Sequence, residues 1–525
     1  MSIVNGINEL VGHVEVLLDN KMEIDAEEKK RRERKGVTYQ IIMSLCANSS
    51  VLGPSMAFGY SAMALGSLMA PTSDVKIDNV QANWIATGTA LGVPFGCIIS
   101  SYTMRRGRKL SLLITSIVST LGWLVIYLSG TYEQILAGRI ISGIATGTAS
   151  VPATVYSAEI ASPKWRSTMV TWTSITMAIG VLLVYIFGYA FKDNWRMVAL
   201  MCALFPVVSA VLTLAIVPET PIWLRDRGRL DEALQVLKRF RGISENVPPP
   251  SELYQELKPR PQRKKQNLIK HLLKRNALVP FAIMLGYFFF QQFSGIFVVV
   301  YYAVNIIESA GVTIDPYLGA VLIGFTRLVG SSLVAAVSER FGRRKPSIVS
   351  GSGMTIFMGL LSIYLLLNTY GYIINDGGLI PVICILMYIF TSTLGFLVIP
   401  FAMVGEVYPT KVKEVLAGAT SCINYIFSSV TVKIYPDMEI AMGKHGVFIF
   451  FTVLSFLGTL FVAFFLPETR GKTLREIEDM FSKEEKITDS QEKRMVDVND
   501  FSKEEELLRN NVSKINDPLK NDGGV

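Results

Sequence analysis

The sequence predicts an all-α membrane protein of twelve transmembrane helices in two pseudo-symmetric halves of six helices each. Half of the 525 residues are hydrophobic, 18% are charged, and the mean hydropathy is +0.39. That composition is too apolar for a soluble domain of this length. Charged motifs also occur twice, about 235 to 250 residues apart, with long apolar segments between the copies. Membrane proteins with internal repeats often hold a central site between their halves.

Three pairs of charged motifs define the repeat, with one member of each pair in either half. They are Met104-Arg105-Arg106-Gly107-Arg108-Lys109 with Glu339-Arg340-Phe341-Gly342-Arg343-Arg344-Lys345, Pro218-Glu219-Thr220-Pro221 with Pro467-Glu468-Thr469-Arg470, and Glu159 seven residues before Arg166 with Glu406 seven residues before Lys413. Halves that carry the same motifs in the same order are expected to share one fold.

The apolar segments are long enough to cross a bilayer, because a spanning helix needs about 20 apolar residues. The expected spans are 39–62, 80–101, 109–129, 134–157, 167–190, 196–217, 277–303, 316–338, 346–368, 378–406, 413–434 and 446–466. The corresponding domains are an N-terminal tail (1–38), a first half (39–217), a linker with short helices (218–276), a second half (277–466) and a mostly disordered C-terminal tail (467–525).

Basic residues concentrate in alternate connections, those after the second, fourth, sixth, eighth and tenth spans. The opposite loops are nearly free of them, and the main exceptions are Lys76, Lys192, Lys433 and Lys444. The positive-inside rule then puts both termini in the cytosol. This topology explains the net charge of +8, so nucleic acid is not an expected partner, whereas the lipid bilayer is.

Two stretches outside the spans are expected to be helical. Residues Arg229 to Arg241 carry apolar side chains at helical spacing and predict a short amphipathic helix in the linker. A second short helix is expected from Leu474 to Phe481.

The sequence offers no catalytic or metal-binding pattern. Its five cysteines lie in apolar stretches, and its three histidines are far apart and lack ligand spacing. We therefore expect no enzyme activity, no cofactor and no metal site.

Gln291 and Gln292 are the strongest candidates for substrate contact, because adjacent amides in an apolar span need partners and can both donate and accept. Hydrogen bonding between helices is the alternative. Nearby, Gly286 and Gly295, and Gly395 with Pro400, are expected to interrupt the seventh and tenth spans where backbone faces the site. Gly138, Gly143 and Gly147 predict close helix contact in the fourth span.

The duplicated charges predict a gate. Opposite charges from the two halves can pair across a closed cytosolic end and separate when that end opens, each pair contributing about 0–1 kcal/mol. The alternative is that the basic residues only set the topology. The positive-inside rule, however, does not require the acids that recur with them.

These motifs resemble the sugar-porter branch of the major facilitator superfamily. The similarity covers about residues 37–482 and includes the sets above, Gly138-Arg139, Pro152 to Glu159, Gln291 to Ile296 with Tyr301-Tyr302, Glu406-Val-Tyr-Pro409 and Pro467 to Leu474. The ending of span ten is most similar to insect trehalose and hexose facilitators. The resemblance implies the major facilitator fold and a sugar carrier of the plasma membrane.

The resemblance also implies a site. Gln291, Gln292 and Asn424 match sugar-binding positions of the family. At five other binding positions this chain carries a residue that differs from the family's usual one. These residues are Ser174, Phe297, Arg327, Phe401 and Tyr425. The implied gating set is Arg105, Arg108, Arg139, Glu159, Arg166, Glu219, Tyr301, Tyr302, Glu339, Arg343, Arg344, Glu406, Lys413 and Glu468.

Coupling to protons is not expected. Proton-driven members of the family carry an aspartate after Phe-Gly-Tyr in span one, where this chain has Ser61. The leading hypothesis is a facilitative uniporter. The alternatives are a carrier of anionic organic solutes, motivated by Arg327, a proton-coupled sugar symporter, and a nutrient sensor that does not transport. No protein partner is predicted.

Overall fold

The computed structural model describes residues 2–244, 247–248, 251–257, 272–309, 314–372, 377–409, 412–470, 476–477 and 480–481, and every regular element in them is a helix. The first half holds α1 (Ser2–Met69), α2 (Asn79–Arg106), α3 (Arg108–Leu128), α4 (Tyr132–Ala149), α5 (Pro152–Ile160), α6 (Arg166–Ala190) and α7 (Trp195–Ala215). The linker holds α8 (Pro221–Asp226), α9 (Leu230–Phe240) and α10 (Ser251–Glu256). The second half holds α12 (Arg275–Phe293), α13 (Ile296–Tyr301), α14 (Ala303–Ser309), α15 (Pro316–Phe341), α16 (Arg344–Thr369), α17 (Leu379–Leu394), α18 (Ile399–Val407) and α19 (Lys413–Phe465).

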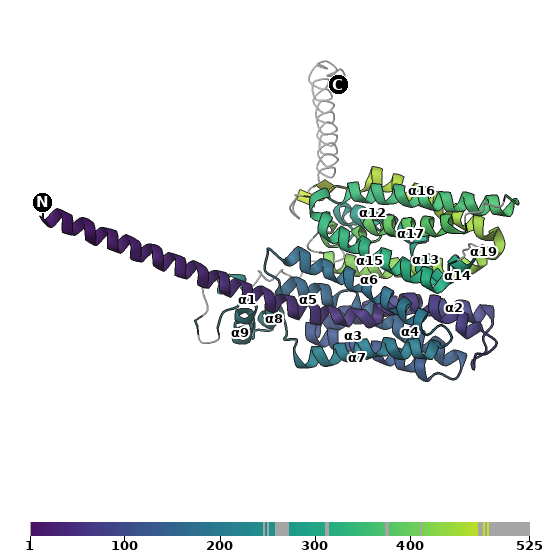
Figure 1. Cartoon of the computed structure of the whole chain (residues 1–525), viewed down its shortest axis with the longest axis horizontal. Coiled ribbons are helices and arrows are strands. Elements are labelled where there is room, and N and C mark those ends of the chain that lie inside the picture. Colours follow the sequence, from purple (N-terminus) through teal and green to yellow (C-terminus); the bar gives the residue numbers. More distant parts are fainter. Residues whose placement is uncertain are drawn as a thin grey trace, which may run out of the picture.

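The two halves form two layers of roughly parallel helices. Figure 1 shows α1 to α7, in purple to teal, below α12 to α19, in green to yellow. The linker helices α8 and α9 lie at one end of the bundle, beside the part of α1 that extends beyond it. Between the layers, α6 packs on α15 and α2 packs on α19.

Ten helices in the described ranges are long and apolar enough to cross a membrane, where twelve spans were expected. The difference has two causes. The run from Val415 to Phe465 is counted once, although the backbone of Gly443 is non-helical and divides it into two parts, each longer than the about 20 residues that a span needs. The expected fourth span is divided between α4, with 18 residues, and α5, which begins at Pro152.

The second half also contains the expected helix breaks, with one correction. Gly295 has a left-handed backbone (φ 89°) and separates α12 from α13. Gly395 ends α17, and α18 begins four residues later. Gly286, in contrast, lies inside α12 without interrupting it. Its Cα faces the ring of Phe461, so a small residue serves helix packing there.

Glycines let α2 and α4 approach closely. A Cβ on Gly143 would lie 2.0 Å from the carbonyl oxygen of Thr89, and one on Gly147 would lie 2.1 Å from that of Val93. Gly138 faces α3 in the same way, where its Cβ would lie 2.6 Å from Ile126. The predicted close helix contact of the fourth span is therefore confirmed at all three glycines, with two different neighbours.

The amphipathic linker helix is confirmed as α9. It buries Ala233, Leu237 and Phe240, and acidic residues in its first turn and basic residues in its last turn match the helix dipole. Gln40 of α1 donates to the carbonyl of Phe240 at 2.7 Å. The linker is therefore attached to the first half. Of the second short helix, expected from Leu474 to Phe481, the structure describes four helical residues.

Hydrogen bonds join the halves near the end of the bundle opposite the charged motifs. The Tyr185 hydroxyl donates to the Val300 carbonyl at 2.8 Å, and the Asn83 amide donates to the Lys433 carbonyl at 3.1 Å. Tyr302 donates to the Asn83 side chain at 3.4 Å. These contacts close that end of the bundle in this conformation.

Candidate functional site

A cluster of buried amides lies where α12 ends and α19 passes it. The Gln292 Nε2 donates to Asn424 Oδ1 at 2.7 Å, and both residues are fully buried. Within the described part of the chain, the Gln292 Oε1 and the Asn424 Nδ2 have no hydrogen-bond partner. Leaving such a buried polar atom unpaired costs about 1–3 kcal/mol. One acceptor and one donor are therefore available to a ligand that carries hydroxyl groups.

Gln291 makes different hydrogen bonds from the adjacent Gln292. Its Nε2 donates to the carbonyl oxygens of Phe396 and Leu397, at 2.6 and 3.1 Å. These carbonyls lie in the break between α17 and α18, where the helix no longer satisfies them. The alternative expected for the two glutamines, hydrogen bonding between helices, therefore applies to both amide nitrogens: that of Gln291 bonds the break between α17 and α18, and that of Gln292 bonds Asn424 of α19.

Aromatic rings from both halves pack on the closed end beside the amides. Phe297 and Tyr301 of α13 lie 5.7 and 6.0 Å from Phe58 of α1, measured between ring centroids. The buried Tyr301 hydroxyl forms no hydrogen bond with any described residue. Tyr425 directly follows Asn424 on α19 and is also buried. Short α13 thus brings two of the expected residues to the contact between halves.

Two residues of the expected binding set are less buried. Phe401 lies on α18, packs 5.1 Å from the ring of Phe288, and keeps 39% of its surface exposed. Ser174 lies on α6 and is partly buried. These two side chains are therefore not part of the buried amide cluster.

The first half holds a fully buried arginine whose described partners are all uncharged. Arg139 donates to the carbonyls of Ala57 and Ile85, at 3.0 and 3.2 Å, and to the hydroxyl of Ser61. Its guanidinium carbon lies 5.3 Å from the centroid of the Tyr60 ring. Ser61, the position where proton-driven members carry an acid, is thus a direct partner of Arg139.

A second buried arginine, Arg327, lies near the middle of α15. Only 5% of its surface is exposed, and no residue that the structure describes forms a hydrogen bond with its Nη1. The neighbouring Tyr185 of α6 uses its hydroxyl to bond the Val300 carbonyl. A charge at this depth is unfavourable by at least about 2.5 kcal/mol, so the position requires a partner or water that offsets this.

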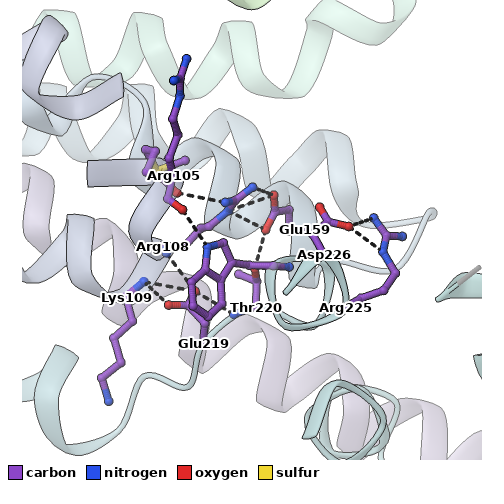
Figure 2. Close-up of polar contacts among 10 residues, drawn as sticks. Arg105, Arg108, Lys109, Glu159, Glu219, Thr220, Arg225 and Asp226 are labelled. Carbon is purple, nitrogen blue, oxygen red and sulfur yellow. Dashed lines mark hydrogen bonds and ion pairs between the residues drawn. The ribbon is translucent and has the colours of Figure 1, made fainter. Parts of the chain in front are cut away.

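The charged motifs of the first half meet at the other end of the bundle (Figure 2). Arg108 forms a two-point ion pair with Glu159, with nitrogen-to-oxygen distances of 2.7 and 3.1 Å. Glu219 accepts hydrogen bonds from the backbone N–H groups of Arg108 at 2.9 Å and Lys109 at 3.2 Å. The Thr220 hydroxyl donates to Glu159 and so connects the two acids.

The second half repeats this arrangement. Arg343 pairs with Glu406 at 2.7 Å. Glu468 accepts from the backbone N–H groups of Arg343 at 3.0 Å and Arg344 at 3.1 Å. The Thr469 hydroxyl donates to Glu406 at 2.8 Å.

Both ion pairs therefore form inside one half, whereas the sequence led us to expect pairing across the halves. The reason is local. In each half the arginine lies at the start of the third membrane helix, α3 or α16. The acid lies in the last turn of the short helix, α5 or α18, that follows the break in the fourth or tenth expected span. In this conformation the clusters fix helix ends within a half.

A glycine leaves room for the acid in each cluster. A Cβ on Gly107 would lie 2.7 Å from Glu219 Oε2, and one on Gly342 would lie 2.7 Å from Glu468 Oε2. Gly342 also has a positive φ of 77°. The glycine of the repeated motif is thus explained by the carboxylate that caps the next helix.

The two capping acids differ in pKa. Burial raises the pKa of Glu219, and the hydrogen bonds from Thr220, Arg108 and Lys109 only partly oppose it. Glu468 is less buried, so backbone N–H donors, led by that of Arg343, outweigh the burial and lower its pKa.

The remaining charged gating candidates belong to the same motifs or to the sequence that follows them. Arg105 and Arg166 have exposed side chains, and the Arg105 carbonyl accepts from Trp223 and Arg227 of the linker. Lys413 is half-buried near Glu406. The Arg344 guanidinium donates to the carbonyl of Ala463. The side chain of Glu339 lies outside the described part of the chain.

Sequence reasoning missed the threonines and the capping role of the acids. Thr220 and Thr469 follow the capping glutamates directly, and their duplication in the Pro-Glu-Thr motif was the available signal. The pairing of Ser61 with Arg139 joins residues 78 positions apart and had no local signal.

Comparisons with known proteins agree with this architecture. The chain is similar to the proton:xylose symporter XylE of the major facilitator superfamily bound to 6-bromo-6-deoxy-D-glucose, with a TM-score of 0.68 and 22% identity over 85% of this chain and all of that one. An inward open conformation of the xylose transporter XylE from E. coli gives a TM-score of 0.68 and 21% identity, over 84% of this chain and 99% of that one. The fold is that of the major facilitator superfamily.

Some relatives are more similar to this chain in sequence than these solved structures are. A family model described as sugar (and other) transporter matches residues 26–481. The facilitated trehalose transporter Tret1 of Polypedilum vanderplanki is 32% identical over 448 residues, which are 84% of this chain and 87% of that protein. Trehalose transporter 1 of Drosophila melanogaster is 32% identical over 446 residues, and this chain spans about half of its length. The chain belongs to the sugar (and other) transporter family. It is a multi-pass membrane carrier and not an enzyme, as the motifs predicted.

Proposed function

We propose that this protein is a facilitative uniporter of trehalose or a hexose. It works by alternating access around the buried amide cluster, lies in the plasma membrane, and has both termini in the cytosol. The observation that carries the proposal is the Gln292–Asn424 pair, whose unpaired acceptor and donor fit a ligand rich in hydroxyl groups. Relatives named as trehalose transporters support the substrate class.

Within the proposed site, Gln292 and Asn424 contact sugar directly. Gln291 holds the broken tenth span in place, while Phe297, Tyr301 and Tyr425 surround the ligand on the closed side. The ion pairs of Arg108 and Arg343, with the capping acids, serve as the gating set by fixing the helix ends that move together as one half.

Uniport is supported by the surroundings of Arg139. Its partners, two carbonyls, a hydroxyl and a ring, do not titrate near neutral pH. A proton-driven carrier needs a group that takes up and releases a proton during its cycle, and Ser61 cannot do so. The likeness to a proton:xylose symporter concerns the fold and does not bear on this point.

The orientation is supported by charge. The basic clusters and the basic linker lie at the same end of the bundle, which the positive-inside rule assigns to the cytosol. In that orientation the described conformation is closed toward the outside, where the halves are joined through Asn83 and Tyr185.

Counterflow in proteoliposomes tests the substrate class. Vesicles loaded with unlabelled trehalose, glucose or glucuronate are diluted into a trace of the same labelled solute. We expect transient label uptake with trehalose or glucose. The absence of counterflow with every neutral sugar tested, for protein that remains monodisperse, would contradict the proposal.

A second candidate function, transport of an anionic organic solute, is favoured by Arg327. Its guanidinium is buried with an unpartnered nitrogen, and an anion would offset its charge. If this function is correct, labelled glucuronate shows counterflow, Arg327→Lys retains it, and Arg327→Asn abolishes it while neutral sugar transport persists. If Arg327→Asn leaves all fluxes unchanged, Arg327 does not select the substrate.

A further inference from the structure

We propose that Lys192 and Lys433 are reciprocal latches that hold the two halves together at the end opposite the charged motifs. Each lysine belongs to one half and binds the start of a helix in the other half. The proposal concerns the conformational cycle of the carrier and does not depend on which solute is carried.

Lys192 joins the first half to the second. It follows α6 and forms an ion pair with Asp315, the residue that caps α15 by accepting from the Tyr317 backbone N–H at 2.9 Å. The Lys192 Nζ also lies 5.6 Å from the centroid of the Tyr317 ring and 4.6 Å from that of Tyr189. The Tyr317 hydroxyl in turn reaches α1, where it would lie 2.8 Å from a Cβ on Gly66.

Lys433 makes the reverse connection, from the second half to the first. Its Nζ lies 3.9 Å from the centroid of the Trp84 ring, near the start of α2. Its backbone carbonyl accepts from Asn83 at 3.1 Å. Asn83 also accepts from Tyr302, whose ring packs 4.9 Å from that of Tyr435. One turn of α2 is thus held by a cation, a carbonyl and a hydroxyl of the other half.

The two contacts are related by the internal repeat. Lys192 lies just after the fifth expected span and Lys433 near the end of the eleventh, which is the fifth span of its half. Their partners lie at the starts of the second and eighth expected spans, which are likewise equivalent. An arrangement that occurs twice, once in each direction, indicates a selected device rather than a chance surface contact.

The sequence contains an independent sign of this role. Lys192 and Lys433 are two of the four main lysines that depart from the positive-inside rule. Topology disfavours lysine on this side, so another function has to account for them. The other two, Lys76 and Lys444, are exposed.

The chemistry suits a contact that must break in every cycle. Both members of the Lys192–Asp315 pair keep about a third of their side-chain surface exposed, at 34% and 36%. Exposed ion pairs and cation–π contacts are weak and reversible, and salt screens the ion pair. Two such latches can bias the closed state without locking it.

The Lys192–Asp315 latch is not a pH switch in the physiological range. The hydrogen bond to Lys192 lowers the pKa of Asp315, and the same bond raises that of Lys192. The closed state therefore keeps the pair charged until the pH falls through the lowered pKa of Asp315, below the ordinary range of aspartate. Two further carboxylates in the described ranges, Asp193 and Glu308, also lie near Tyr317.

The test is the accessibility of Ser67→Cys, a buried α1 position next to Gly66, to a membrane-impermeant maleimide added from outside. The same protein without this cysteine corrects for the five native cysteines. Lys192→Met and Lys433→Met should each raise the labelling rate severalfold, and the double variant more. Lys76→Met and Lys444→Met, matched losses of an exposed outer lysine, should leave it unchanged.

A charge-exchange variant distinguishes loss of the ion pair from misfolding. Lys192→Asp combined with Asp315→Lys restores an ion pair and should return labelling toward the parent rate, whereas Lys192→Asp alone should show the highest rate. Unchanged labelling in the Lys192→Met Lys433→Met protein would overturn the proposal. So would an equal rise in the Lys76 and Lys444 variants. No sugar is needed, so either result is independent of the proposed substrate.

Discussion

Glu219 and Glu468 cap the first turns of α3 and α16 in the same way, one in each half of the molecule. Each accepts from two successive backbone N–H groups at the start of a membrane helix, beside a glycine that leaves space for the carboxylate. The internal repeat therefore preserves a complete hydrogen-bonding unit and not only a charge pattern.

The two acids should nevertheless differ in their effect on stability. The lowered pKa of Glu468 means that its carboxylate stabilises the fold above the ordinary glutamate pKa, and that this contribution is lost as the pH falls through the lowered value. The raised pKa of Glu219 has the opposite sign, because the folded protein binds that proton more tightly than the unfolded chain does. At pH 7 we expect Glu468→Gln to destabilise by about 0.3–1 kcal/mol, the usual value for an acid at a helix N-terminus, and Glu219→Gln to destabilise less.

Thermal unfolding in detergent at pH 7 and at pH 5 measures this difference. The difference in unfolding temperature between Glu468→Gln and Glu219→Gln should be smaller at pH 5 than at pH 7. A larger loss for Glu219→Gln at pH 7 would contradict the assignment.

Gly342→Ala should destabilise the second half. The new Cβ would lie 2.7 Å from Glu468 at a backbone φ of 77°, a conformation that costs a non-glycine residue about 1–3 kcal/mol. Gly405→Ala is the matched control, since no atom of the described ranges lies within 4 Å of its added Cβ. We expect a lower unfolding temperature only for Gly342→Ala. Equal behaviour of the two variants would contradict both the backbone strain at this φ and the tight contact with Glu468.

The two adjacent glutamines should separate by phenotype. Gln292→Ala and Asn424→Ala should raise the KM for sugar at normal surface expression, because each removes a group proposed to bond a hydroxyl, worth about 0.5–1.5 kcal/mol. Gln291→Ala should instead lower stability and expression, since it leaves two buried carbonyls in the break of span ten unpaired.

Concentration-dependent uptake and detergent stability of each variant test this separation. Gln134→Ala removes an exposed glutamine of α4 and serves as the control. Parent-like uptake by both Gln292→Ala and Asn424→Ala would remove these residues from the proposed site.

The sequence was sufficient for the repeat, the family and the helix breaks at Gly295 and Gly395, because each depends on composition or on a local motif. The sequence was not sufficient to predict which side chains contact one another. Arg108 and Glu159 were expected to reach across the halves, yet they pair within one, since the contact depends on how α3 and α5 pack. Gln291 and Gln292 are neighbours in sequence and still differ in role, because successive residues of a helix face different directions.

The measurement that tests the account most directly is sugar accumulation under an imposed proton gradient. Proteoliposomes are given labelled trehalose and, in parallel, labelled glucose, with and without an inward proton gradient. Because Arg139 pairs with Ser61 and other uncharged groups, we predict that the internal concentration of the transported sugar reaches the external one and stays there in both conditions. Accumulation above the external concentration that depends on the gradient would contradict the facilitative mechanism.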